Sequence, residues 1–316
     1  MSALTADRSA AEPARTSEGL AGGLLQALEQ PATWPVALAG FLARGGLVAF
    51  LFPIVVLPTP AAVQADLAPL FVPFVFGQTS PGLVALTIVV GGLALAWLVL
   101  GGLVGAWADV ALARSFGEPP EAPAGPDAGM PAPTLLPTAR VLAARLLAHA
   151  PLAAALAWGA LRIGEAGYRE LVTPFEVATP LVIRIALAAP EALAVVGVAW
   201  LLGEAAGGLA AREIVLAGRT VPRAVVRGWV GLARRPFASL ATVIATSLLL
   251  AVAVLPGLLA AGTAWSRLRM VLYDGRLADL LLPLGVFVAL WLGALILAGV
   301  ATAARSAIWT GVWLRR

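Results

Sequence analysis

Six predominantly apolar segments decide what this chain can fold into. About 20 apolar residues cross the hydrocarbon core of a bilayer as an α-helix, because each residue advances the helix by about 1.5 Å. The segments cover residues 35–56, 83–107, 151–163, 181–203, 237–260 and 280–301. The third is short, and it spans only if residues 139–150 enter the bilayer as part of the same helix. The sequence therefore predicts an all-α, polytopic membrane protein with six transmembrane helices.

The composition supports the membrane class and excludes several kinds of site. Of the 316 residues, 60% are hydrophobic and 12% are charged, whereas a soluble domain is about 25% charged. There is no Cys and one His, His149, so disulfides, thiolate nucleophiles and histidine-rich metal sites are not expected. The sequence has no HExxH motif and no Lys for a phosphate-binding loop. We expect no metal, no cofactor and no enzymatic activity.

The distribution of arginine predicts the orientation. All 21 basic residues are Arg, of which fourteen lie in the tail, the second and fourth connections and the C-terminal segment, against five in the alternate loops. Because cytoplasmic loops carry the excess of basic residues, both termini are predicted to be cytoplasmic, with residues 58–81 and 264–278 outside. Tryptophan is expected at the membrane interfaces, at Trp34, Trp107, Trp229, Trp265, Trp309 and Trp313.

Proline and tryptophan recur at matching places and suggest an internal repeat. A proline opens each odd-numbered span, at Pro35, Pro151 and Pro236. A Trp-Leu pair followed by glycine closes each even-numbered span, beginning at Trp97, Trp200 and Trp291. Three copies in one orientation are parallel two-helix repeats, each led by an interfacial amphipathic helix. The alternative is that helices rich in Ala, Leu and Gly resemble one another by composition alone.

The repeat divides the chain into five parts. These are a disordered tail (1–19), a first helical hairpin (20–114), a flexible Pro/Ala/Gly linker (115–137), a second hairpin (138–219), and a third hairpin with a C-terminal helix (220–316). Within the first outer connection, residues 57–81, an apolar stretch is broken by Pro69 and Pro73 and is expected to form a cap too short to span.

A basic segment, residues 200–240, joins the fourth and fifth spans. A helix can restart at Pro222, with Arg223, Arg227 and Arg234 on one side. Val225, Trp229 and Leu232 then lie on another side. Such a helix prefers the membrane–water interface. The candidates for binding lipid head groups are Arg219, Arg223, Arg227, Arg234 and Arg235, and the expected partners are membrane lipids, above all anionic ones, and a membrane protein. No nucleic-acid partner is expected, because no basic domain stands clear of the apolar helices.

The basic segment carries a resemblance to a known family. With Arg212–Pro236 between its fourth and fifth spans, the chain resembles uncharacterised six-helix bacterial membrane proteins related to the membrane domain found beside some glycerophosphodiester phosphodiesterases. The resemblance covers roughly residues 180–305. It implies a location in the bacterial inner membrane and no catalytic residue, because the His and carboxylate metal ligands of the phosphodiesterase domain do not occur in this sequence. Mitochondrial carriers also have three two-helix repeats, but the acidic residue of their signature is missing after each repeat proline.

Four ionisable residues within or at the edges of the spans are candidate polar sites: Arg44, Arg184, Glu191 and Glu204. Glu191 follows Pro190 near the middle of the fourth span, where a proline kink exposes a carbonyl group. Arg184 lies seven residues earlier and could neutralise it, either as part of a functional site or as a purely structural ion pair. Arg44 lies about 13 Å into the first span. It could pair with Glu204 or extend to the inner head groups.

Two functional hypotheses follow. The first is a non-catalytic membrane protein that acts as a scaffold, an assembly factor or a module binding lipid and protein partners. The second is a small transporter or channel subunit with a polar path near Glu191. The pairs Gly101/Gly105 and Gly203/Gly207 predict close helix contacts at the inner ends of two spans.

Overall fold

The computed structural model describes residues 19–55, 69–70, 73, 77–117, 134–172, 181–274 and 279–315. All regular secondary structure in these residues is helical. Within these described ranges, five helical segments are long and apolar enough to cross a membrane, and a sixth results if two helices bent by 46° count as one span. The all-α class is thereby confirmed for the described residues, and the length and apolarity of these helices agree with a membrane protein. Most of the predicted tail, cap and linker lies outside the described residues.

The helices group into two compact units. The first contains residues up to Thr33, Asp109–Leu249 and the segment from Ala303, and the second contains Trp34–Ala108 and Leu250–Thr302. Three long helices contribute residues to both units: α5 (Pro81–Gly117), α11 (Pro236–Tyr273) and α12 (Leu281–Leu314).

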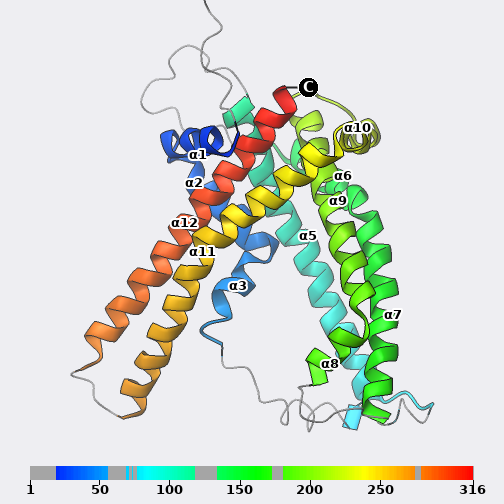
Figure 1. Cartoon of the computed structure of the whole chain (residues 1–316), viewed down its shortest axis with the longest axis vertical. Helices are drawn as coiled ribbons and strands as arrows, with labels where there is room; N and C mark the ends of the chain where they lie inside the picture. The colour runs from blue at the N-terminus through cyan, green and yellow to red at the C-terminus, as the bar shows by residue number, and fades with distance from the viewer. Residues whose placement is uncertain are drawn as a thin grey trace, which may run out of the picture. The chain divides into compact units, whose positions relative to one another are not determined.

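Helix α9 (Pro190–Val215) is the centre of the first unit. It packs against α6 (Leu135–Ala148), α7 (Ala150–Val172) and α10 (Val221–Arg234), and Figure 1 shows α7 and α9 side by side. Neighbouring helices approach closely because residues 205–211 of α9 are all Ala, Gly or Leu and all buried. The unit also contains α1 (Gly19–Glu29) and α8 (Leu181–Ala188). Trp309, expected at an interface, is instead 3% exposed in this core.

Prolines set the helix boundaries of the first unit. Ala189 (φ −136°, ψ 53°) and Arg235 (φ −138°, ψ 61°) leave the helical conformation directly before Pro190 and Pro236, where α9 and α11 begin. The ring of a proline disfavours helix in the preceding residue but suits the first turn of the next helix. The fourth span, predicted as one helix over 181–203, is therefore broken at Ala189. The third span, predicted over 151–163, is longer than predicted, because α7 extends to Val172.

The second unit is built around a bent first span. α2 (Thr33–Phe41) and α3 (Leu47–Leu51) are joined by the π-helical turn η1 (Leu42–Gly46). Inside that turn Gly45 has φ 107°, a conformation that residues with a side chain rarely adopt. Phe50 is fully buried and packs edge to face on Phe41 and Trp291, with ring centroids 6.2 and 6.1 Å away.

The long helices present apolar side chains outward. No residue in the most apolar stretch of α5 is buried, and Ile88, Leu93 and Leu100 are each at least 65% exposed. Contiguous apolar surface of this extent is typical of contact with lipid. α11 has 38 residues, about 57 Å of helix, longer than the roughly 30 Å hydrocarbon core. The predicted outer loop over 264–278 accordingly begins as helix, which continues to Tyr273.

Candidate functional site

Glu204 on α9 is the centre of a charge cluster in the first unit. Arg305 on α12 donates a hydrogen bond of 2.7 Å to Glu204 Oε2. Arg145 on α6 lies 3.7 Å and His149 Nε2 lies 3.4 Å from Glu204 Oε1. The side chains of Glu204 and Arg305 are 19% and 24% exposed, so their charges interact more strongly than those of a surface pair.

Asp109 on α5 extends this cluster through Arg145. Arg145 Nε donates to Asp109 Oδ2 over 2.6 Å, and Asp109 is 7% exposed. Arg145 therefore lies between two carboxylates. The cluster contains two arginines and two acids, and with His149 neutral its formal charge is balanced. It connects α5, α6, α9 and α12 within the first unit.

Local sequence explains how His149 and Arg145 reach α9. His149 Nδ1 is hydrogen-bonded to the carbonyl of Arg145, one helical turn earlier, at 2.8 Å. Gly203 leaves the room for the imidazole ring, because a Cβ atom there would lie 2.7 Å from His149 Cδ2. The close contact predicted for Gly203 and Gly207 is therefore observed. His149 thus packs against α9, and the four-residue spacing of Arg145 and His149 was the sequence signal for their common face.

The two ion pairs considered for the four candidate polar residues do not form among the described residues, and the first of them is Arg44 with Glu204. Glu204 pairs with Arg305, Arg145 and His149, while Arg44 donates to the carbonyl of Gly105 at 2.5 Å. Gly105 has no side chain in the way, since a Cβ there would lie 2.4 Å from Arg44 Nε.

Arg184 and Glu191 do not form the expected pair either. Arg184 lies 3.2 Å from Glu170, and Glu191 accepts a bond of 3.1 Å from Arg162. The reason is the break at Ala189: Arg184 belongs to α8, and Glu191 lies in the first turn of α9 rather than mid-span. The Glu191 side chain is 43% exposed. Arg162 also bonds to Glu165 at 2.7 Å, and Arg169 bonds to Glu165 as well.

Helix α10 has three distinct faces. Ala224, Gly228 and Leu232 are buried against the unit, and Gly228 lets α10 approach α9 so closely that a Cβ there would lie 2.5 Å from the carbonyl oxygen of Ala206. Leu232, expected in contact with lipid, is thus a core residue, and Trp229 packs beside it. The reason is that this small-residue face fits the small residues of α9.

The other two faces of α10 are exposed. Arg223, Arg227 and Arg234 form one stripe, and Val226, Val230 and Ala233 form an adjacent apolar stripe. Val226 is 61% and Val230 is 42% exposed. The apolar face available to lipid is therefore different from the one that the sequence predicted.

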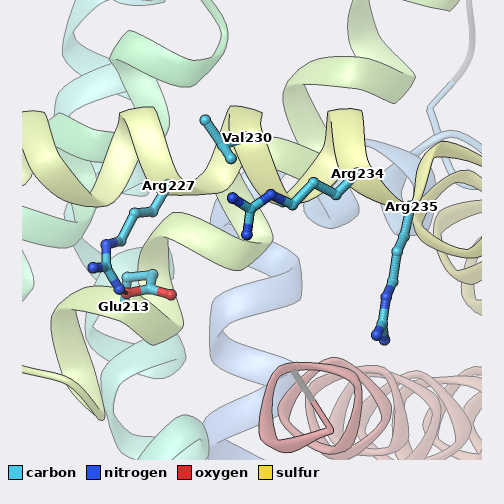
Figure 2. A pocket seen from close by; sticks show the side chains of 6 residues that line it. Glu213, Arg227, Val230, Arg234 and Arg235 are labelled. Atoms are coloured by element: carbon cyan, nitrogen blue, oxygen red, sulfur yellow. Dashed lines mark ion pairs between the residues drawn. The ribbon is translucent and has the colours of Figure 1, made fainter.

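A pocket of about 500 Å³ lies beside the arginine stripe. Its lining residues are Glu213, Arg227, Val230, Gly231, Arg234 and Arg235. Figure 2 shows the Arg227 side chain reaching toward Glu213, with Arg234 between Arg227 and Arg235 in this view. Arg227 Nη1 lies 3.9 Å from Glu213 Oε2, and Trp313 donates to Glu213 Oε1 over 3.2 Å. Three of the five lipid-binding candidates thus meet at one pocket, whereas Arg219 and Arg223 do not line it.

Glu213 is the member of this pocket that sequence reasoning missed. It is 8% exposed, and no donor among the described residues is hydrogen-bonded to its Oε2 atom. Arg212, the residue before it, is 2% exposed and donates to the carbonyl groups of Gly208 and Ser306. Among the described residues, no group of three His, Cys, Asp or Glu is placed to hold a metal ion.

Comparison with known proteins gives no relative: no family model, no curated protein and no solved structure matches the chain.

Proposed function

We propose that the chain is a non-catalytic, multi-pass protein of a bacterial inner membrane that binds lipid and membrane partners through α10. The observation that supports this proposal is the pair of exposed stripes on α10, one of arginine and one of valine and alanine. A helix with adjacent cationic and apolar faces is stabilised at the membrane–water interface, where each face contacts its preferred medium. Both termini and α10 are cytoplasmic in this proposal.

Helix α10 is held by one face and exposes the other two. Its third face packs on α9 and fixes the helix to the first unit. The two exposed stripes can therefore contact lipid or a partner protein. Each arginine near an anionic membrane surface contributes about 1 kcal/mol to the free energy of membrane binding at low salt. An interfacial helix fixed in this way can gather anionic lipid or orient a partner protein without chemical catalysis.

This proposal is tested by measuring how deep α10 lies in a lipid bilayer. The chain contains no Cys, so single spin labels can be attached through Val226→Cys, Val230→Cys and Arg223→Cys. In lipid bilayers, labels at the two valine positions should collide with oxygen, which is concentrated in lipid. The label at Arg223 should collide with a water-soluble nickel complex. Equal nickel accessibility at all three positions would show that α10 is not interfacial.

A transporter or channel subunit is the second candidate, and the cluster around Glu204 is what favours it. Ionisable groups inside a membrane protein often mark ion or proton pathways, and this cluster brings five of them together. Glu191 has less support as the site of such a path, because it lies in the first turn of α9 and pairs with exposed Arg162. Proton or ion flux in proteoliposomes that is lost in Glu204→Gln would support transport.

A further inference from the structure

The pocket beside α10 has the composition of a site for a small anion. Guanidinium groups present donors in a planar fork that matches phosphate oxygens. Neither Arg234 nor Arg235 has an acidic partner among the described residues, whereas Arg227 has Glu213 at 3.9 Å. A pocket of about 500 Å³ is within the usual range for small ligands, roughly 300–1,000 Å³.

We propose that this pocket binds a terminal phosphate group, the group that a phosphate monoester and free phosphate share, and the inference rests on the proposed interfacial position of α10. The lining residues carry three positive charges and one negative charge, a net charge of +2. A monoester carries about 1.5 to 2 negative charges near pH 7, which neutralises the pocket. A phosphodiester carries a single negative charge and leaves the pocket positive.

Glu213 adds a second criterion for the ligand. Its Oε1 atom accepts a hydrogen bond from Trp313, and its buried Oε2 atom has no hydrogen-bond donor in the part of the chain that the structure describes. A buried acceptor without a donor is costly, because it has lost its hydrogen bonds to water. The two criteria apply to the two protonation states of a monoester: the dianion neutralises the pocket, and the monoanion, with one negative charge, has a P–OH group that can donate to Oε2. The phosphate group of a diester offers neither.

Two sources can supply this chemistry, a lipid head group and free phosphate. Val230 lines the pocket and also belongs to the exposed apolar stripe with Val226. A lipid such as phosphatidic acid would place its phosphate among the arginines and its acyl chains along that stripe. Inorganic phosphate would use the arginines alone.

The test compares two lipids that have the same acyl chains but different head groups. The full-length protein is reconstituted in phosphatidylcholine nanodiscs that contain either phosphatidic acid, a monoester, or phosphatidylglycerol, a diester. Native mass spectrometry then measures the retained lipid. Titration of the protein in detergent with inorganic phosphate is the second arm.

The variant is Arg234→Gln/Arg235→Gln, and the control is Arg223→Gln, which removes a charge from α10 outside the pocket. All three arginines are exposed, so these changes should leave the fold intact.

The wild type should retain phosphatidic acid in preference to phosphatidylglycerol. The double variant should lose that preference, with a fall of about 25-fold for phosphatidic acid, from about fivefold for each arginine. Arg223→Gln should weaken both lipids by up to about fivefold and keep the preference. Binding of inorganic phosphate that depends on Arg234 and Arg235 supports the site and assigns it to free phosphate.

Equal retention of the two lipids by the wild type, without phosphate binding, would overturn the terminal-phosphate site. Equal losses of phosphatidic acid binding in Arg234→Gln/Arg235→Gln and in Arg223→Gln would also overturn it. Neither result bears on the depth of α10, which the spin labels measure, so failure of the pocket and failure of the interfacial helix are distinguishable.

Discussion

At the scale of single residues, Glu204 is the side chain on which most charges converge. Its carboxylate faces Arg305, Arg145 and His149, and Arg145 continues to Asp109. Removing one partner of a largely buried pair is costly, because the remaining charge loses its compensation while it is still shielded from water. Removing both partners avoids that penalty.

A double-mutant cycle tests this argument. Glu204→Gln and Arg305→Gln should each lower the free energy of unfolding, toward the low end of about 3–5 kcal/mol because both side chains keep some exposure. The double variant should lose less free energy of unfolding than the sum of the two single losses, since neither charge is left without its partner and Arg145 still pairs with Asp109. Thermal unfolding in detergent measures all three. Additive losses would show that the two residues do not interact.

Glu191→Gln is the matched control for that cycle. The pair formed by Glu191 and Arg162 is exposed on both sides, and exposed pairs contribute little to stability. We expect no measurable change in unfolding temperature. A loss as large as that of Glu204→Gln would contradict the difference in burial between the two sites.

At the scale of elements, the contact between α9 and α10 depends on small residues. Gly228 faces the carbonyl of Ala206, and Ala224 and Leu232 are buried on the same side. This packing decides which side of α10 remains exposed, and so which residues can reach lipid. The pocket at Arg234 and Arg235 depends on the same contact, because Glu213 belongs to α9.

Gly228→Ala should therefore destabilise the first unit. The added methyl group would lie 2.5 Å from a backbone oxygen, which cannot move without separating the helices, and overpacking of this kind costs about 1–3 kcal/mol. The control is Gly197→Ala on α9, where a Cβ meets nothing within 4 Å. That change should be neutral or stabilising, because Ala favours helix over Gly. Chemical or thermal unfolding compares them, and equal effects would disprove the close contact.

At the scale of the whole molecule, the arginine distribution gives an orientation that labelling can test. The fourteen arginines of the tail, two connections and C-terminal segment are expected in the cytoplasm, with the connection after α11 outside. In intact cells, a membrane-impermeant thiol reagent should label Asp274→Cys and leave Arg223→Cys unlabelled. Labelling should reverse in inverted membranes. Labelling of Arg223→Cys from outside would invert the topology and the proposed position of α10.

Helix positions were predictable from the sequence because their causes are local. Apolar runs require helices in a bilayer, since backbone groups find no other hydrogen-bond partners there. Prolines mark where helices start: α10 begins beside Pro222 and α11 at Pro236. The break at Ala189 has the same local cause. The sequence predicts the place of this break, at Pro190, but as a kink within one helix, whereas the structure has two separate helices there.

Side-chain partners depended on the tertiary structure. Arg184 and Glu191 are seven residues apart, but the break at Ala189 places them on different helices, so helical spacing does not bring them together. Glu204 meets Arg305, 101 residues later, and Glu213 meets Arg227 across a turn. The rotation and register of packed helices decide such contacts, and these are fixed by where Gly and Ala allow close approach. The sequence by itself therefore determined the class of the protein and its helices, and packing decided which charges meet and which face of α10 is exposed.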